Sequence, residues 1–160
     1  MFQYISSSPA DTARIATLIG ERVPAGTVFC LDGDLGAGKT LFVQNMAKAM
    51  GVESEVTSPT FNLMNIYEGT SRIFHFDLYR LEQEYELEDI GFFEYVNDPE
   101  AVVVIEWADR FFDAMPEDYV LIEIQRSEDD ENKRLISFSQ RGELYEAFFK
   151  EMEELCQYLQ

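Results

Sequence analysis

Several kinds of residue and segment are scarce in this sequence, and each scarcity excludes a class of protein. The two cysteines, Cys30 and Cys156, lie far apart in apolar stretches without disulfide or metal-ligand spacing, so we assign them no chemistry. No apolar run reaches the length of a membrane span, and no basic segment precedes an apolar one near the start. We therefore expect a cytoplasmic protein without membrane contact.

Basic residues are also scarce. The chain has 12 Lys and Arg against 31 Asp and Glu, which gives a formal net charge of -19. Such a charge repels the phosphate backbone of a nucleic acid at long range. We expect no independent binding of nucleic acid, so that any tRNA would be held only indirectly, through partner proteins.

Apolar and aromatic side chains are abundant, at 46% and 14% of the chain. A chain of 160 residues with this composition can bury one sizeable core. No repeat, linker or low-complexity segment divides it. We expect a single domain over residues 1–160.

The strongest chemical signal is the glycine-rich segment at residues 33–40, GDLGAGKT. It follows a predicted strand at 27–31 and precedes a predicted helix at 41–50, which is the context of a phosphate-binding loop, or Walker A motif. The glycines let backbone N–H groups converge on phosphate oxygens at the positive end of the helix, while Lys39 reaches the β- and γ-phosphates and Thr40 ligates magnesium. The residues expected to contact the nucleotide here are Asp34, Gly36, Ala37, Gly38, Lys39, Thr40 and Leu41.

The remaining pattern predicts an α/β fold with a mostly parallel central sheet, flanking helices and an antiparallel β portion. We expect an edge strand at 1–6, a helix capped by Ser8 and running to about Val23, and a final amphipathic helix after Gly142. Two hairpins supply the antiparallel portion, with strands at 61–67, 72–78, 119–126 and 135–139.

Two carboxylates compete for the second acidic position that a phosphate-loop enzyme needs near Thr40. Glu106 follows Val102-Val103-Val104-Ile105, an apolar run typical of a strand buried on both faces. Asp77 shares a strand face with His75, opposite Phe74, Phe76 and Leu78. We expect both carboxylates near the metal and leave open which one binds it directly.

Three further segments lie close to these candidates in the sequence. Thr57-Ser58-Pro59-Thr60 is typical of a loop that senses the γ-phosphate, because its hydroxyls can report nucleotide hydrolysis as order or disorder. Trp107, the only tryptophan, directly follows Glu106, where it forms either core or the wall of the site. Residues 81–109 contain no Lys or Arg, so their acidic helix face is either solvated or a docking patch.

Taken together, these residues resemble the bacterial TsaE family, formerly called YjeE. The matching motifs, in order, are GDLGAGKT at 33–40, SPTF at 58–61, HFDLYR at 75–80 and IEWA at 105–108. The resemblance spans nearly the whole chain, and four motifs in this order are far more specific than the phosphate loop alone.

The resemblance implies a small Mg²⁺-dependent ATPase that works with TsaB and TsaD in making N6-threonylcarbamoyladenosine (t6A) in tRNAs that read codons beginning with A. The residue patterns described above select Lys39, Thr60, Asp77 and Glu106 for catalysis, and Thr40, Asp77 and Glu106 for the metal. The resemblance adds two nucleotide contacts, Thr12 and a position in the late hairpin at 130–134, where we select Arg134.

Two other functions share the phosphate loop. A small-molecule kinase usually needs arginines in a lid over the transferring phosphoryl group, and residues 81–109, where a lid would sit, have none. A nucleotide-dependent binding module without significant hydrolysis is the second alternative, because the sequence offers no obvious catalytic base. For the same reason, hydrolysis by an ATPase of this kind is expected to be slow without partners.

Overall fold

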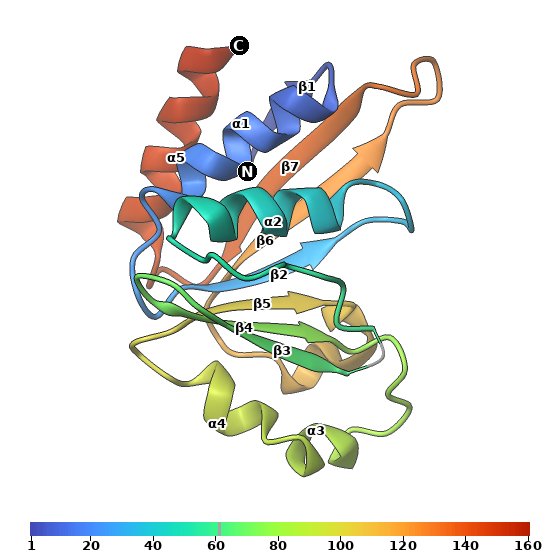
Figure 1. Cartoon of the computed structure of the whole chain (residues 1–160), viewed down its shortest axis with the longest axis vertical. Helices are drawn as coiled ribbons and strands as arrows, with labels where there is room; N and C mark the ends of the chain where they lie inside the picture. The colour runs from blue at the N-terminus through green and yellow to red at the C-terminus, as the bar shows by residue number, and fades with distance from the viewer. Residues whose placement is uncertain (61) are drawn as a thin grey trace.

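The computed structural model describes residues 1–60 and 62–160 (Figure 1). In these residues seven strands form one sheet in the order β1-β7-β6-β2-β5-β4-β3. The strands are β1 (Phe2–Ser6), β2 (Val28–Asp32), β3 (Met64–Glu68), β4 (Arg72–Asp77), β5 (Val102–Glu106), β6 (Tyr119–Arg126) and β7 (Arg134–Arg141).

The strand directions confirm the mostly parallel sheet with an antiparallel portion. Strand β2 pairs in parallel with β5 and β6, and β4 pairs in parallel with β5. The hairpin strands β3 and β7 run antiparallel to β4 and β6. Because β1 is antiparallel to β7, it points the same way as the central strands. Strand β1 also lies at the edge of the sheet, as expected.

Helices cover both faces of the sheet (Figure 1). The helices α1 (Pro9–Gly20), α2 (Lys39–Ala49) and α5 (Glu146–Leu159) contribute to one apolar cluster with the sheet. The short helices α3 (Tyr85–Asp89) and α4 (Phe92–Val96) and the 3-10 helix η1 (Ala108–Ala114) pack in a second cluster on the opposite face. The fold is therefore three layers, with the sheet between the two groups of helices.

Side chains alternate between the two faces of the sheet along each central strand, and this alternation decides which face carries the polar residues of the site. In β4, Phe74 and Phe76 belong to the cluster under α3 and α4, as the period of two predicted. His75 and Asp77 consequently face the side of α2, and both are buried. All five residues of β5 are buried, and its last residue, Glu106, pairs in register with Asp77.

Several element boundaries differ from the sequence prediction by one to three residues, and two of them show why. Helix α1 begins after Ser8, whose hydroxyl caps Asp11 N at 3.1 Å as expected. It ends at Gly20 rather than Val23, a turn follows at 21–22, and Pro24 disfavours helical backbone at Val23 itself. Strand β3 begins at Met64 rather than at Phe61, since Leu63 has φ 66°, outside the range of a strand, and its N–H donates to Pro59 O at 2.7 Å. Phe61 itself lies outside the described residues.

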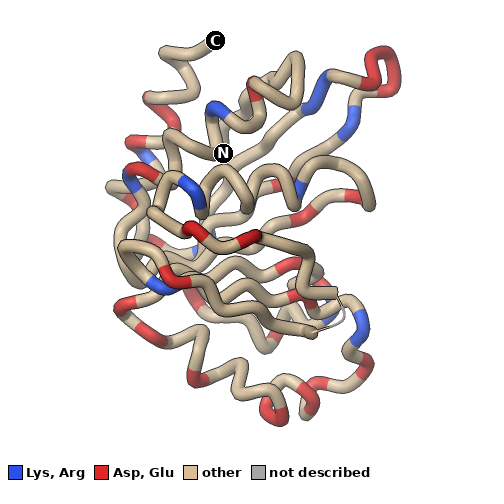
Figure 2. Tube along the Cα trace, in the orientation of Figure 1, with Lys and Arg blue, Asp and Glu red and all other residues tan. Residues whose placement is uncertain are grey.

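Acidic residues are spread over most of the chain. Figure 2 shows Asp and Glu along most elements, including the α3 and α4 segment, and Lys and Arg at scattered positions. Among the described residues, no helix is long and apolar enough to cross a membrane. The longest, α5, has 14 residues, whereas a span needs about 20.

Candidate functional site

The phosphate loop lies between β2 and α2, at the carboxyl end of the central parallel strands. Helix α2 begins at Lys39, and Gly38 before it has φ 113°, a backbone conformation that side chains rarely tolerate. A Cβ on Gly33 would lie 2.6 Å from the carbonyl oxygen of Ile124 in β6. The glycines therefore let the loop turn tightly beside β6 and present the first N–H groups of α2, which attract anions.

Two arginines of the β6 and β7 hairpin donate hydrogen bonds to backbone carbonyls of this loop. Arg126 donates through Nη2 to Leu35 O at 3.2 Å, and Arg134 donates through Nε to Ala37 O at 2.9 Å. Both cations thus lie against a loop whose shape suits phosphate. Sequence reasoning selected Arg134 but missed Arg126, which lies 91 residues away along the chain from the residue it contacts.

A cleft of about 440 Å³ opens in front of the loop. It brings together all five residues predicted for catalysis and metal binding. Its lining consists of Leu35, Gly36, Gly38, Lys39, Thr40, Leu41, Ser58, Thr60, Asp77, Tyr79, Glu106 and Trp107. Of these, sequence reasoning gave no role to Leu35 and Tyr79; the position of Tyr79 just beyond the end of β4 is the signal that points to it.

Glu106 is one of two buried acids of the cleft, with a side chain only 4% exposed. Its Oε1 lies 3.7 Å from Lys39 Nζ, and its Oε2 lies 2.6 Å from His75 Nε2. The two contacts occupy one oxygen each. A carboxylate held at both oxygens has a fixed orientation, which suits a group that must direct a proton or a cation.

Asp77 is bound to the loop at residues 57–60. Its Oδ2 accepts the Thr60 hydroxyl at 3.0 Å, and its Oδ1 accepts Tyr79 N at 3.0 Å. The hydroxyls of Thr60 and Ser58 are 2.8 Å apart, and both residues line the cleft. Asp77 and His75 therefore share a strand face as predicted but serve different partners, since His75 contacts Glu106.

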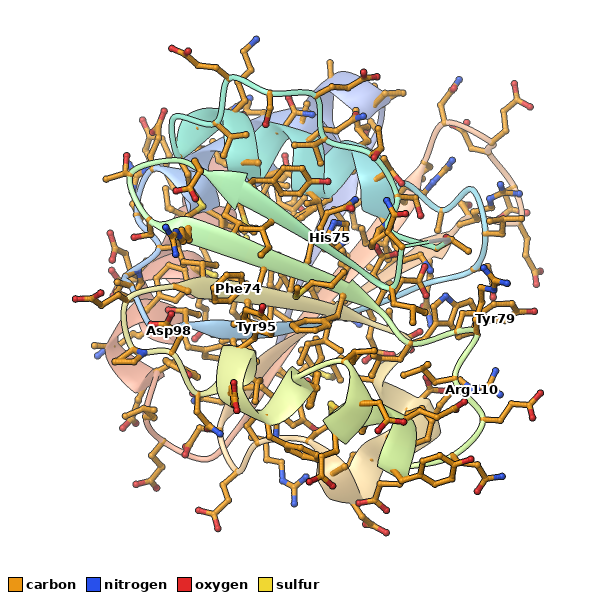
Figure 3. The ribbon with its side chains drawn as sticks, turned by 60° about the horizontal axis from the view of Figure 1, so that its bottom comes forward. Phe74, His75, Tyr79, Tyr95, Asp98 and Arg110 are labelled. Carbon is orange, nitrogen blue, oxygen red and sulfur yellow. The ribbon has the colours of Figure 1, made fainter. Side chains whose placement is uncertain are left out.

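Aromatic rings form one wall of the cleft. Lys39 Nζ lies 4.7 Å from the ring centroid of Trp107, and the rings of Trp107 and Tyr79 are 4.9 Å apart. The guanidinium of Arg110 lies 5.6 Å from the Tyr79 ring. Figure 3 shows Tyr79 and Arg110 together at one end of the sheet, with His75 further inside on β4. Trp107 therefore forms part of the wall of the cleft, which was one of the two alternatives, core or wall, that the sequence left open.

A small cavity of about 70 Å³ lies on the other side of the phosphate loop. Thr12 and Arg134 line it together with Ala37, Gly38 and Leu41 of the loop and helix α2. The structure therefore places Thr12 and Arg134, which are far from the phosphate loop in the sequence, beside that loop. Thr12 is 2% exposed, and its hydroxyl is 2.7 Å from the hydroxyl of Ser6.

Asp34 lines neither the cleft nor this small cavity. Its backbone carbonyl accepts the N–H of Ala37 at 2.9 Å, and its contact with nucleotide stays a prediction.

The donor set of the cleft fits magnesium. In the described residues, no group of three or more His, Cys, Asp or Glu side chains is arranged to hold a metal ion by itself. Magnesium does not require such a cage, because it prefers one or two carboxylates together with phosphate oxygens and water. Thr40, Asp77 and Glu106 offer hard oxygen ligands within the larger of the two cavities described beside the phosphate loop.

Known proteins resemble this chain in sequence and in fold. A family model described as "Threonylcarbamoyl adenosine biosynthesis protein TsaE" matches residues 6–136. The TsaE protein of Treponema pallidum is 41% identical over 121 residues, which cover 76% of this chain and 89% of that protein. The TsaE protein of Bacillus subtilis is 38% identical over 146 residues, covering 91% of this chain and 89% of the relative. The crystal structure of YdiB from the same organism superposes with a TM-score of 0.81 at 30% identity, covering 96% of this chain and 95% of that one. The chain has the phosphate-loop NTPase fold and belongs to the TsaE family.

Proposed function

We propose that this protein is an ATPase required for t6A formation in tRNAs that read codons beginning with A, and that it acts with the TsaB and TsaD proteins. The observation that carries the proposal is the cleft where Lys39, Thr40, Thr60, Asp77 and Glu106 meet beside the phosphate loop. Membership of the TsaE family supports the pathway. We further propose that residues 1–160 act as one ATPase domain and that, as a tRNA-modifying protein, it works in the cytoplasm.

Lys39 is the residue that binds the β- and γ-phosphates. Its ammonium group lies 3.7 Å from Glu106 and packs over Trp107. Phosphate oxygens at the amino end of α2 would draw this ammonium toward the loop, where it adds charge to the N–H groups of the helix. Arg126 and Arg134 hold the loop in shape and add positive charge beside it.

Glu106 is the residue that orients the attacking water or holds the metal. Its Oε1 loses the Lys39 ammonium when phosphate binds and then faces the cleft with an open acceptor position. When bound, Mg²⁺ would neutralise charge that develops on the phosphate oxygens. Thr40, Asp77 and Glu106 are the side chains that would hold it.

Thr60 and Asp77 form the nucleotide-sensing contact. The hydrogen bond between them ties the loop at 57–60 to the carboxyl end of β4. A γ-phosphate at the cleft would compete for the hydroxyls of Ser58 and Thr60, so the loop would be ordered differently before and after hydrolysis. Such a change is the means by which partner proteins could read the nucleotide state.

Thr12 and Arg134 lie on the far side of the loop and are the proposed contacts to the nucleoside. They enclose a cavity between α1 and the β6 and β7 hairpin. No guanine-reading motif is visible in the chain, so adenine and guanine nucleotides should be distinguished imperfectly.

The position of the acidic helices α3 and α4 disfavours a small-molecule kinase. Leu87, Phe92 and Val96 pack these helices into the cluster on the face opposite α2. Helices α3 and α4 therefore do not lie over the cleft, and they carry no arginine toward a transferring phosphoryl group.

Measuring ATP hydrolysis by the purified protein alone, with TsaB, with TsaD and with both tests the proposal. We expect slow turnover alone and marked activation only when both partners are present. Fast turnover without partners would contradict the coupling. Binding of ATP without hydrolysis under all four conditions would support a binding module, and ATP-dependent phosphorylation of a small molecule would support a kinase.

A further inference from the structure

The only histidine of the chain, His75, lies inside the protein in direct contact with Glu106. It is fully buried, on the face of β4 that is turned toward α2. Its Nε2 lies 2.6 Å from Glu106 Oε2, across the parallel pair of β4 and β5. The functions assigned above to the cleft do not use this residue.

The surroundings of the ring determine where its proton sits. Nδ1 of His75 is buried and has no hydrogen-bond partner among residues 1–60 and 62–160. A buried N–H without an acceptor is costly, and Glu106 already pairs with the Lys39 ammonium, so a neutral ring with its proton on Nε2 satisfies the most groups. His75 is then a donor to Glu106 Oε2.

This hydrogen bond gives the two oxygens of Glu106 different surroundings. Oε2 contacts an imidazole that is fully buried on the face of β4 turned toward α2. Oε1 is on the side of Lys39, at the cleft. The carboxylate therefore has one anchored oxygen and one that is available for chemistry.

We propose that His75 is a positioning residue that fixes the orientation of Glu106 and so directs Oε1 to the attacking water or the metal. The inference rests on the proposed ATPase function. Its physical basis is general: a neighbour that binds the second atom of a functional group fixes the direction of the first, and its loss typically costs about 10- to 100-fold in affinity or activity at metal sites.

The test compares two substitutions of His75 with a matched control. His75→Gln places an amide N–H near the original Nε2, whereas His75→Leu removes the donor and keeps a buried side chain. Ile73→Val removes one methylene from a buried residue two positions earlier on the same strand face, and it serves as the control for lost packing.

ATP turnover and nucleotide affinity are measured for each variant with TsaB and TsaD present. We expect His75→Leu to lower kcat about tenfold or more, while its ATP dissociation constant changes less than about threefold. His75→Gln should recover much of this loss in kcat. Ile73→Val should hydrolyse ATP at the wild-type rate. Equal losses in His75→Leu and His75→Gln, or a loss in Ile73→Val as large as that in His75→Leu, would show that His75 acts only through packing.

Combining His75→Leu with Glu106→Gln separates positioning from any other role. Because His75 is proposed to act through the Glu106 carboxylate, His75→Leu should cost less than about threefold when that carboxylate is absent. A full additional tenfold loss would overturn the inference.

The sole histidine also gives a readout that does not depend on activity. In protein labelled with 15N-histidine, the ring signals should show the Nε2-protonated tautomer, and that signal should change in Glu106→Gln. An Nδ1-protonated ring would overturn the inference even in an active protein. Wild-type protein without turnover in the presence of both partners would instead refute the proposed ATPase, and the tautomer would still decide whether His75 orients Glu106.

Discussion

Lys39, the first residue of α2, and Glu106, the last residue of β5, form an ion pair of 3.7 Å in which both side chains are less than a tenth exposed. The pair joins the phosphate loop to the acidic end of the central sheet. A nucleotide phosphate bound at the loop, as proposed, would have to compete with Glu106 for the lysine.

Replacing Lys39 should remove most of the stabilisation that nucleotide gives. For a ligand at 100 times its dissociation constant, binding to the folded state adds about 2.7 kcal/mol to the free energy of unfolding. Thermal unfolding of Lys39→Ala with and without Mg·ATP should show little of the shift seen in wild type. Lys48→Ala removes the same charge from an exposed position in the last turn of the same helix and should keep the full shift. An unchanged shift in Lys39→Ala would contradict the role of Lys39.

Nucleotide binding should change the fluorescence of Trp107, which is the only tryptophan in the chain. The Lys39 ammonium lies 4.7 Å from its ring, and moving this charge to the phosphates alters the field at the indole. Titration of the protein with Mg·ATP should give a saturable spectral change that is absent in Lys39→Ala. An identical emission spectrum at saturating nucleotide would mean that the lysine does not leave the indole.

Removing the Thr40 hydroxyl should affect nucleotide binding mainly when magnesium is present. Thr40 lines the cleft beside Lys39, where it is the proposed hydroxyl ligand. Calorimetric titration of Thr40→Ala with ATP should show a larger loss of affinity in magnesium than in EDTA. Equal losses in the two buffers would argue that Thr40 serves the phosphates or the loop, and Thr40→Ser should restore the magnesium-dependent part.

The two thiols should be unreactive in the native protein and should make stability fall at high pH. Burial raises the pKa of Cys30 and of Cys156 to about 12 each. Unfolded thiols lose their protons from about pH 8.5, whereas the folded ones keep theirs until about pH 12, so stability falls as pH rises through this window. At pH 8, a thiol reagent such as DTNB should label neither cysteine before unfolding and both after it. Rapid labelling of the native protein would contradict the burial of these side chains.

The sequence was informative wherever local pattern decides structure. The glycine spacing at 33–40, the Ser8 cap and the alternation of Phe74 and Phe76 with His75 depend on backbone rules that hold within a few residues. The phosphate loop, α1 and β4 were therefore predicted in kind, with errors only at their ends. The mostly parallel sheet followed from strands separated by helices.

Contacts between distant segments could not be predicted in the same way. The pair of His75 and Glu106 depends on β4 and β5 being neighbours in register, and the contact of Arg126 with Leu35 depends on the return of β6 beside the loop. Strand order is set by packing of the whole sheet, which no short pattern encodes. The late start of β3 likewise depends on the left-handed backbone conformation of Leu63. A leucine side chain does not predict this conformation.

The most direct test of the account is ATP turnover and t6A formation by Glu106→Gln in the presence of TsaB, TsaD and tRNA. This substitution keeps the shape of the side chain and removes its charge, while Glu100→Gln makes the same change at an exposed position just before β5. We predict that Glu106→Gln lowers both rates about tenfold or more with folding retained, and that Glu100→Gln leaves both unchanged. Full activity of Glu106→Gln in both assays would contradict the account and leave Asp77 as the acidic residue of the site.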